Sequence, residues 1–522
     1  MQRESGDTIS LWMATADVPE HSPLDGDAEA DVCVVGAGIA GLSVAYLLAR
    51  DGRRVIVIDD GPIGGGETSR TTAHLSFALD DGYARLERMH GEEGARLAAE
   101  SHIAAVDLIE RIVADESIAC DFERLDGYLF LGPGDSAELL DRELEAAQRA
   151  GVPGVERVPR APRAPFDTGP ALRFPRQGQF HPLRYLAGLA RRIVQRGGRI
   201  HAGSHVEEIS GGTECEVTTS DGHGIRAGAV VVATNSPVSD YVVTHVKQAP
   251  YRSFVIAARV PRRSIPTELY WDTADPYHYV RLHPAGGQGA GGGRDLLVVG
   301  GEDHKTGQKD DADERFGRLE AWTRARFPMV TDIAYRWSGQ VLEPNDSLAF
   351  IGRQPGREKN IYIATGDSGH GMTHGTIAGL LLTDLIAGRE HRWATLYDPS
   401  RITVSRASAA EFAKENLNVA VQYADWIRPG EVGSADEIRA GTGALLREGT
   451  KILAAYRDDE GALHLRSAVC THLKCIVDWN SAEKSWDCPC HGSRFDPYGR
   501  VLNGPAIAPL EEVDAEVEAK VN

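Results

Sequence analysis

The segment Asp31-Val32-Cys33-Val34-Val35-Gly36-Ala37-Gly38-Ile39-Ala40-Gly41 decides the fold of most of this chain. An apolar strand runs into the pattern G-x-G-x-x-G, and residues 42–50 then have the apolar spacing of a helix. Gly52 ends that helix, and Val55-Ile56-Val57-Ile58 forms a second strand ending at Asp59, 23 positions after Gly36. A glycine pattern alone is weak, but strand, helix and acid in register predict a dinucleotide-binding βαβ unit.

Each glycine of the pattern has a physical task. Gly36 allows a tight turn, Gly38 lets the backbone approach a pyrophosphate, and Gly41 lets the helix pack closely on the strand. The pyrophosphate would lie at the helix N-terminus, and the acid at the second strand end would accept a hydrogen bond from a ribose hydroxyl. The expected nucleotide-binding residues here are Gly36, Ala37, Gly38, Ile39, Ala40, Gly41, Asp59 and Asp60.

Two further segments favour FAD over NAD. Residues 64–75 form a glycine- and hydroxyl-rich loop suited to phosphates and a flavin edge, although a plain polar loop is the alternative. Residues 361–365 form a strand that leads into a helix ending near Ile386, whose N-terminus could stabilise an anionic reduced flavin. The expected cofactor-binding residues of these segments are Ser69, Arg70, Thr71, Thr72, Ala73, His74, Gly366, Gly369, His370, Gly371, Met372 and Thr373.

Taken together, these segments resemble the D-amino-acid oxidase/DadA-like family of FAD-dependent oxidoreductases over roughly residues 28–400. The resemblance extends to His181-Pro182-Leu183 before a helix, to Val206 where the family touches adenine, and to Ala233 and Thr234 after a strand returning to the FAD site. It implies oxidation of a C–H bond next to nitrogen. The arginine that holds the substrate carboxylate in amino-acid-oxidising relatives is Val341 here, which puts a simple amino-acid substrate in doubt.

Strand-like segments between residues 251 and 301 predict an antiparallel sheet that forms the substrate pocket over the flavin. The six glycines within residues 286–293 lie between two such strands and indicate a hairpin connection, so no second nucleotide site is expected. Arg281 could replace the missing carboxylate anchor, the alternative being a strand arginine that faces solvent. The substrate-binding candidates are Tyr279, Arg281, Gln340 and His370, and no catalytic residue is assigned.

A second motif lies near the carboxyl end. Cys470-Thr471-His472-Leu473-Lys474-Cys475 is followed by Cys488-Pro489-Cys490-His491-Gly492-Ser493, with fifteen residues between His472 and Cys488. Two thiolates and two imidazoles in alternation suit a [2Fe–2S] cluster with one iron held by histidines. A structural zinc site is the alternative, but zinc spacing usually keeps cysteines and histidines in separate pairs. The motif therefore predicts a one-electron redox centre.

This motif resembles the Rieske iron–sulfur family over residues 432–522. The resemblance implies that Cys470 and Cys488 bind one iron, that His472 and His491 bind the other, and that Cys475 and Cys490 form a disulfide. It also implies a serine and a tyrosine that hydrogen-bond the cluster sulfurs. Ser493 matches the serine but Phe495 replaces the tyrosine, so we expect a potential in the middle of the Rieske range of roughly −150 to +300 mV.

Composition limits the partners of the protein. A formal charge of −20 argues against nucleic acid or an anionic membrane surface, but allows a basic electron-carrier protein. No apolar stretch is long enough to span a bilayer and no secretory signal is visible, so a cytoplasmic location is expected.

The expected fold class is α/β followed by all-β. An FAD-binding Rossmann-like domain with an antiparallel-sheet substrate domain precedes an all-β Rieske domain. Residues 84–150 should be a helical layer and residues 157–176 a connecting loop. The expected divisions are an N-terminal extension (1–30), the oxidoreductase (31–398), a helical linker (399–430) and the Rieske domain (431–522); within the oxidoreductase, the nucleotide-binding parts are about 31–80, 180–245 and 340–390, and the substrate sheet is about 246–339.

The expected function is an FAD-dependent dehydrogenase for an amine or amino-acid-like small molecule, relaying single electrons through the Rieske cluster to an external carrier of ferredoxin or cytochrome type. Two alternatives stay open. One is a redox-responsive or electron-transfer protein without small-molecule turnover, and the other is a reductive enzyme whose electrons enter through the cluster.

Overall fold

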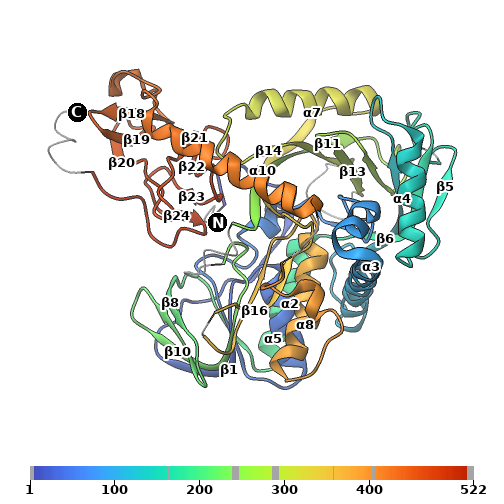
Figure 1. The fold of residues 1–522 in the computed structure, drawn as a ribbon, viewed down its shortest axis with the longest axis horizontal. Helices are drawn as coiled ribbons and strands as arrows, with labels where there is room; N and C mark the ends of the chain where they lie inside the picture. The colour runs from blue at the N-terminus through green and yellow to red at the C-terminus, as the bar shows by residue number, and fades with distance from the viewer. Residues whose placement is uncertain are drawn as a thin grey trace.

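The computed structural model describes residues 5–162, 164–237, 246–284, 293–356, 358–402 and 406–513. It contains a mostly parallel sheet packed against helices, a large second sheet above it, and a small β-region at one side (Figure 1). The linker helix α10 (Arg406–Gln422) runs between the small β-region and the rest of the molecule. The expected fold class is confirmed.

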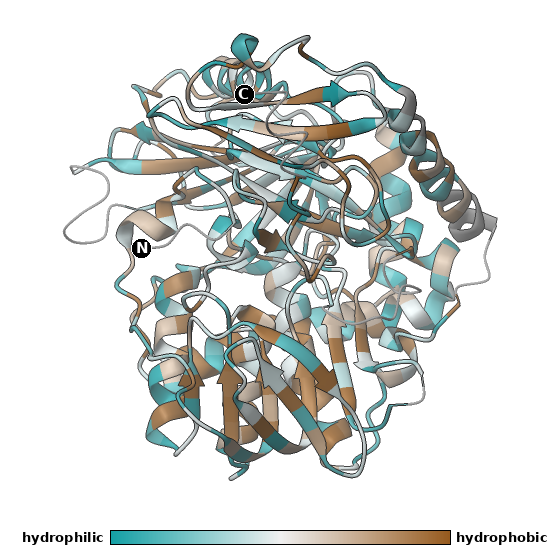
Figure 2. Cartoon of the chain, turned by 90° about the vertical axis from the view of Figure 1, so that its left-hand side faces the viewer, coloured by the Kyte–Doolittle hydropathy of each residue, from teal (hydrophilic) through white to brown (hydrophobic). Residues whose placement is uncertain are grey.

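The first sheet has the strand order β16-β17-β10-β1-β2-β7, with the hairpin β8–β9 attached to β10. Its central strands β1 and β2 pair in parallel over residues 32–35 and 55–58, and these paired residues are apolar and buried on both faces, as is typical of parallel strands. Helices α2 (Ile39–Arg50), α5 (Pro182–Gln195) and α8 (Gly371–Ile386) pack together beside it, and Figure 2 shows the apolar strands of the sheet. The strands are β1 (Ala28–Val35), β2 (Val55–Ile58), β7 (Arg199–His201), β8 (Val206–Ser210), β9 (Cys215–Thr219), β10 (Gly224–Val232), β16 (Phe350–Arg353) and β17 (Ile361–Thr365).

The second sheet has the order β15-β11-β14-β13-β12-β4-β6-β3, and β5 pairs with β6. All of its pairings are antiparallel except that of β12 with β4. Helix α7 (Ala312–Arg326) packs against β11 and β14. The glycine-rich segment 286–293 connects β13 to β14, and residues 285–292 lie outside the described residues. The strands are β3 (His74–Leu75), β4 (Glu123–Phe130), β5 (Glu156–Val158), β6 (Ala171–Gln179), β11 (Gln248–Val260), β12 (Leu269–Asp272), β13 (His278–His283), β14 (Asp295–Lys305) and β15 (Ile333–Pro344).

Two expectations about this sheet are wrong. The segment 84–150 is interrupted by strand β4 between α3 (Tyr83–Asp115) and α4 (Ala137–Arg149), and the supposed loop 157–176 contains part of β6. The charged residues of β4 suit a solvated helical face equally well, and Pro175 lies within β6. Pairing across the sheet decides these segments: β6 lies between β3 and β4, with a register shift between Leu125 and Gly127.

The carboxyl-terminal region contains a three-stranded sheet and a four-stranded sheet. The strands are β18 (Thr442–Glu448), β19 (Lys451–Arg457), β20 (Leu463–Ser467), β21 (Asp478–Asn480), β22 (Ser485–Asp487), β23 (Arg494–Phe495) and β24 (Val501–Asn503). The chain continues from α10 into a short 3-10 helix at Tyr423–Ile427. Within the described part of the chain, no helix has both the length and the apolar composition that crossing a bilayer requires.

Candidate active site and iron–sulfur centre

A cavity of about 530 Å³ lies where the carboxyl ends of the parallel strands meet the second sheet. Most of the expected cofactor residues are on its wall: Gly36, Gly38, Ile39, Ala40, Asp59, Asp60, Arg70, Thr71, Thr72, His74, Val206, Ala233, Thr234, Gly366, Gly369, His370, Gly371 and Met372. The other five, which are Ala37, Gly41, Ser69, Ala73 and Thr373, are not part of the wall.

The glycine turn is packed as a dinucleotide-binding turn must be. Gly36 has φ +108°, and a Cβ there would lie 2.4 Å from the carbonyl oxygen of Ala233. A Cβ at Gly41 would lie 1.9 Å from the carbonyl oxygen of Gly36, so only glycine lets the helix approach the turn this closely. The N-terminus of α2 therefore borders the cavity, and Ile39 N–H donates to Thr68 Oγ1 at 3.1 Å.

Asp59 is held at the end of β2 by the N–H groups of Ala37 and Gly61, which both donate to its carboxylate. Burial raises the pKa of Asp59 to about 7, and the negative charge of Asp60 acts in the same direction. A ribose with hydroxyl donors suits such a carboxyl group. The turn, the helix N-terminus and the acid together fit an FAD dinucleotide.

Three of the four substrate-binding candidates lie on the cavity wall. Tyr279 and Ser253 share a hydrogen bond between their hydroxyl groups at 2.5 Å. The pKa of His370 is raised overall. Burial alone would lower this pKa, but the nearby carboxylates, above all that of Asp80, outweigh burial. The imidazole Nε2 of His370 is 3.3 Å from Asp80 Oδ1.

Arg281 is a correction to the expected substrate site. It is absent from the cavity wall, and it is also buried at 1% exposure, so it does not face solvent. Its Nη1 donates to the backbone carbonyls of Thr72, Ala73 and Phe180 at 3.1, 2.7 and 3.1 Å. The guanidinium therefore fixes the loop that carries the cofactor residues 71–74.

Sequence reasoning missed several acidic and aromatic groups on the wall. Tyr277 donates to Asp80 Oδ2 at 2.8 Å, and it directly precedes β13, which contains Tyr279; the two rings are 5.2 Å apart between centroids. The spacing of these tyrosines in the sequence was a usable signal. Burial raises the pKa of Asp303 to about 7, and the charge of Asp80 adds to the rise. Glu343 and Asp367 are also on the wall, and burial raises the pKa of each.

The second motif forms two loops in the carboxyl-terminal β-region. Cys470 and Cys488 are both buried. The rings of His472 and His491 are 5.0 Å apart between centroids. The sulfurs of Cys475 and Cys490 form a disulfide, and Cys488 Sγ lies within 4.8 Å of both. Two thiols and two imidazoles that converge beside a disulfide fit the Rieske ligand set.

The two histidines have different surroundings. His491 is 6% exposed and borders a crevice lined by Pro250 and residues of α10, whereas His472 is only half-buried. The carbonyl oxygen of Gly492, next to His491, accepts a hydrogen bond from Gln340 Nε2 at 3.0 Å. Gln340 is also on the cavity wall. One side chain thus connects the cavity to a cluster-binding loop.

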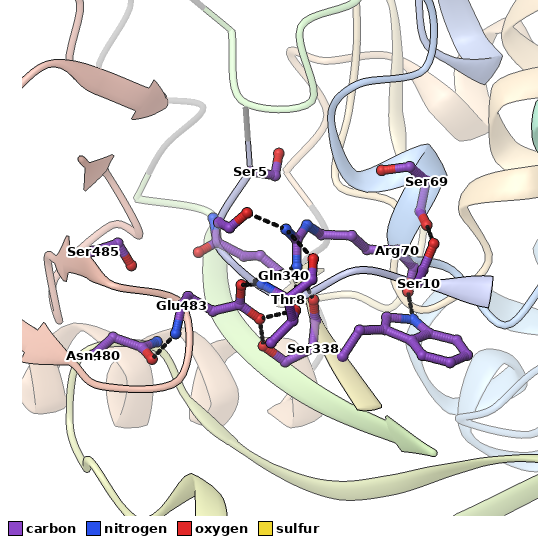
Figure 3. A network of polar contacts seen from close by, with 12 residues as sticks. Ser5, Thr8, Ser10, Ser69, Arg70, Ser338, Gln340, Asn480, Glu483 and Ser485 are labelled. Carbon is purple, nitrogen blue, oxygen red and sulfur yellow. Dashed lines mark hydrogen bonds and ion pairs between the residues drawn. The ribbon is translucent and has the colours of Figure 1, made fainter. Parts of the chain in front are cut away.

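A buried ion network joins the two parts of the chain (Figure 3). The carboxylate of Glu483 is 3.1 Å from Arg70 Nη1 and 3.8 Å from Arg252 Nη1, and all three side chains are at most 1% exposed. Thr8 Oγ1 donates to the same carboxylate at 2.6 Å. The guanidinium of Arg70, expected at the cofactor, therefore binds the carboxyl-terminal domain. The segment that contains Thr8 lies beside Arg70 and Glu483 in Figure 3, and Arg70 Nη2 donates to the carbonyl oxygen of Gly6 at 2.9 Å.

The carboxyl-terminal domain also supplies part of the cavity wall. Asn503 Nδ2 donates to Glu67 Oε1 at 3.2 Å, and the second oxygen of Glu67 accepts from Gln340 N–H. No local sequence signal could have indicated this contact, because its partners are 436 positions apart. The wall residues from this domain are Val501, Leu502, Asn503, Gly504, Ala506 and Ile507.

Comparison with known proteins agrees with this geometry. Residues 31–385 match the family model described as FAD dependent oxidoreductase, and residues 428–514 match the Rieske [2Fe-2S] domain. The Bacillus subtilis protein YhfW, whose name describes a Rieske 2Fe-2S iron–sulfur protein, is 32% identical over 97% of this chain and 98% of its own length.

Two other relatives cover the oxidoreductase part. Gamma-glutamylputrescine oxidoreductase of Escherichia coli is 29% identical over 74% of this chain and 90% of its own length. The structure of glycine oxidase from Geobacillus kaustophilus matches with a TM-score of 0.60 at 19% identity. The match covers 72% of this chain and 99% of that chain. This chain belongs to the FAD-dependent oxidoreductase family and carries a Rieske [2Fe-2S] domain at its carboxyl-terminal side.

Proposed function

We propose that this protein is a dehydrogenase that oxidises a cationic amine at its FAD site and passes the electrons through the Rieske cluster to an external carrier. The observation that carries the proposal is the contact of Gln340, which lies on the cavity wall and donates to Gly492 beside the cluster ligand His491. A cluster held against the wall of the flavin cavity is placed to exchange electrons with it.

The charge of the cavity favours an amine over an amino acid. Among the described residues, the one guanidinium on the wall is that of Arg70, which is paired with Glu483. A substrate carboxylate would thus find no free partner of opposite charge there, whereas an ammonium group would relieve the repulsion between carboxylates. The carboxylates of the wall are Asp59, Asp60, Glu67, Asp80, Asp81, Asp275, Asp303, Glu343 and Asp367.

Four wall residues in and around β13 and β14 are suited to hold an ammonium ion. Tyr277 and Tyr279 have ring centroids 5.2 Å apart and offer aromatic faces, and Asp80 and Asp303 offer negative charge. The relative named gamma-glutamylputrescine oxidoreductase carries an amine in its name, which supports the same class. FAD held at this site would supply a two-electron acceptor for the hydride on the carbon next to nitrogen, after the ammonium group has given up a proton; water would then convert the iminium product to a carbonyl compound and a free amine.

The electrons leave the cluster one at a time, so the final acceptor is a one-electron carrier protein. We place the exit at His472, because this ligand is half-buried whereas His491 is enclosed against the oxidoreductase part. With a formal charge of −20, the chain would attract a basic carrier by long-range electrostatics. Strands β11, β13 and β14 of the second sheet also line the cavity, which favours small-molecule turnover over a pure electron-transfer role.

The test is anaerobic reduction of the flavin by matched compounds that differ only in one carboxylate, such as putrescine against ornithine and tyramine against tyrosine. The flavin band near ~450 nm should bleach with at least one amine and not with its amino-acid counterpart. Asp303→Asn should raise the amine concentration needed for half-maximal bleaching by roughly tenfold, because a charge partner is lost. Bleaching by the amino acids alone would refute the substrate class.

A further inference from the structure

Residues 501–507 of the Rieske domain contact the oxidoreductase part on both sides of the glycine turn. On one side, Asn503 donates to Glu67, whose neighbour Thr68 accepts from Ile39 N–H at the start of α2. On the other side, a Cβ at Gly504 would lie 3.4 Å from the carbonyl oxygen of Ser236. That same carbonyl accepts from Thr234 Oγ1 at 2.7 Å, and Thr234 is on the cavity wall. The loop therefore spans the edge of the dinucleotide site.

The loop is fixed from within its own domain. Asn503 Oδ1 accepts from Arg494 Nη1 at 3.1 Å, and Arg494 is fully buried. Ala506 N–H donates to Ser493 Oγ at 3.0 Å, and Ser493 directly follows the cluster loop 488–492. Two hydrogen bonds thus hold the loop in place, so it moves with the Rieske domain and not with the cavity.

We propose that the loop 501–507 completes the FAD site and that the docked Rieske domain retains FAD. While the hydrogen bond from Asn503 to Glu67 is intact, the loop forms one wall of the cavity that contains the glycine turn. Release of FAD then requires the loop to separate from Glu67. Because binding coupling is reciprocal, bound FAD also stabilises docking of the Rieske domain by the same factor. The inference depends on the FAD cofactor of the family and not on the proposed substrate or electron route.

The variant Asn503→Asp tests this role with little change of shape. The new carboxylate keeps an oxygen for Arg494, so the contact within the Rieske domain is retained, but it faces the carboxylate of Glu67 with like charge. Asn418→Asp on the linker helix is the matched control, because Asn418 uses its Oδ1 to accept from Gln308 and is not on the cavity wall.

The measurements are the FAD dissociation constant of the apoprotein and the rate of FAD release from the full-length protein. Asn503→Asp should raise both by about tenfold or more, the usual effect of losing a hydrogen bond to a charged group, while the Rieske visible circular dichroism spectrum stays unchanged. Asn418→Asp should behave as the wild type. Equal FAD affinity in all three proteins would overturn the proposal.

Hydrogen exchange on the wild-type protein gives a second, mutation-free test. Amides of residues 499–507 should exchange more slowly in the FAD-loaded protein than in the apoprotein, because cofactor and docked loop stabilise each other. Identical exchange of this segment with and without FAD would contradict the coupling even if Asn503→Asp failed to fold.

Discussion

Replacing Glu483 by glutamine tests the interface on which the electron route depends. Burial alone would raise the pKa of Glu483, but the positive charges of Arg70, Arg252 and Arg494 and the hydrogen bond from Ser338 outweigh it and lower the pKa from 4.5 to about 2. That difference corresponds to about 3 kcal/mol of native-state stabilisation at neutral pH. Burial lowers the pKa of Arg252 to about 10, so desolvation of this partner offsets part of the gain.

Glu483→Gln leaves two guanidinium groups, those of Arg70 and Arg252, buried without this counter-charge. We therefore expect a loss of about 3–5 kcal/mol in the free energy of unfolding at pH 7, measured by urea denaturation followed by the cluster absorption. The sign of the pH effect is fixed. The pKa of Glu483 is depressed in the folded state, so its stabilisation is complete above about pH 4.5 and decreases as the pH falls towards 2. The difference in free energy of unfolding between wild type and variant should therefore narrow between these two pH values.

Glu93→Gln is the control for this experiment. Glu93 pairs with Arg96 on the surface and its side chain is 67% exposed, so its replacement should change the free energy of unfolding far less than Glu483→Gln does. If Glu483→Gln is as mild as Glu93→Gln, the buried network does not hold the two parts together and the reasoning fails.

The remaining predictions concern the cofactors. The purified protein should contain about two irons and two labile sulfides per chain. The variants Cys470→Ser and His491→Ala should lose this cluster while FAD stays bound. Zinc in place of iron, in protein made by cells with ample iron, would contradict the prediction. Cys475→Ser should still assemble a cluster with lower stability and potential, and complete loss of assembly would indicate that Cys475 is a ligand. Asp59→Ala should weaken FAD binding by removing the ribose acceptor, and NADH alone should not reduce the wild-type flavin; rapid stoichiometric reduction by NADH would refute a single nucleotide site.

Sequence patterns predicted the local units of this protein well. The strand, glycine turn and helix at residues 31–50 have their signals within a few residues of one another, and the same holds for the two cluster loops and for the helix that begins at Gly371. In each case the backbone geometry demands particular residue types in a short stretch. The structure confirms the Cys475–Cys490 disulfide. The resemblance could imply this pairing because both cysteines lie within the two short ligand motifs.

The contacts between the units were not predictable in this way. Arg70 lies in a segment that resembles a cofactor loop, yet its partner Glu483 is 413 positions away and outside any motif. Arg281 was placed correctly on a pocket strand, but only the packed structure shows that three carbonyls surround its guanidinium. Strand β4 carries alternating charges that also fit a helix, and sheet pairing decided it. Tertiary packing determines the partners of these side chains and the strand state of β4, and the spacing of residues in the sequence does not encode that packing.

The most direct test of the proposed relay is rapid mixing of the intact protein with a reducing amine, with flavin and cluster absorption followed separately. We predict that flavin bleaching is followed by reduction of the cluster, and that Gln340→Ala lowers the rate of the second phase by a larger factor than the rate of the first, because Gln340 links the cavity wall to Gly492 beside His491. An added one-electron carrier should then reoxidise the cluster. A cluster that stays oxidised while the flavin turns over would contradict the account.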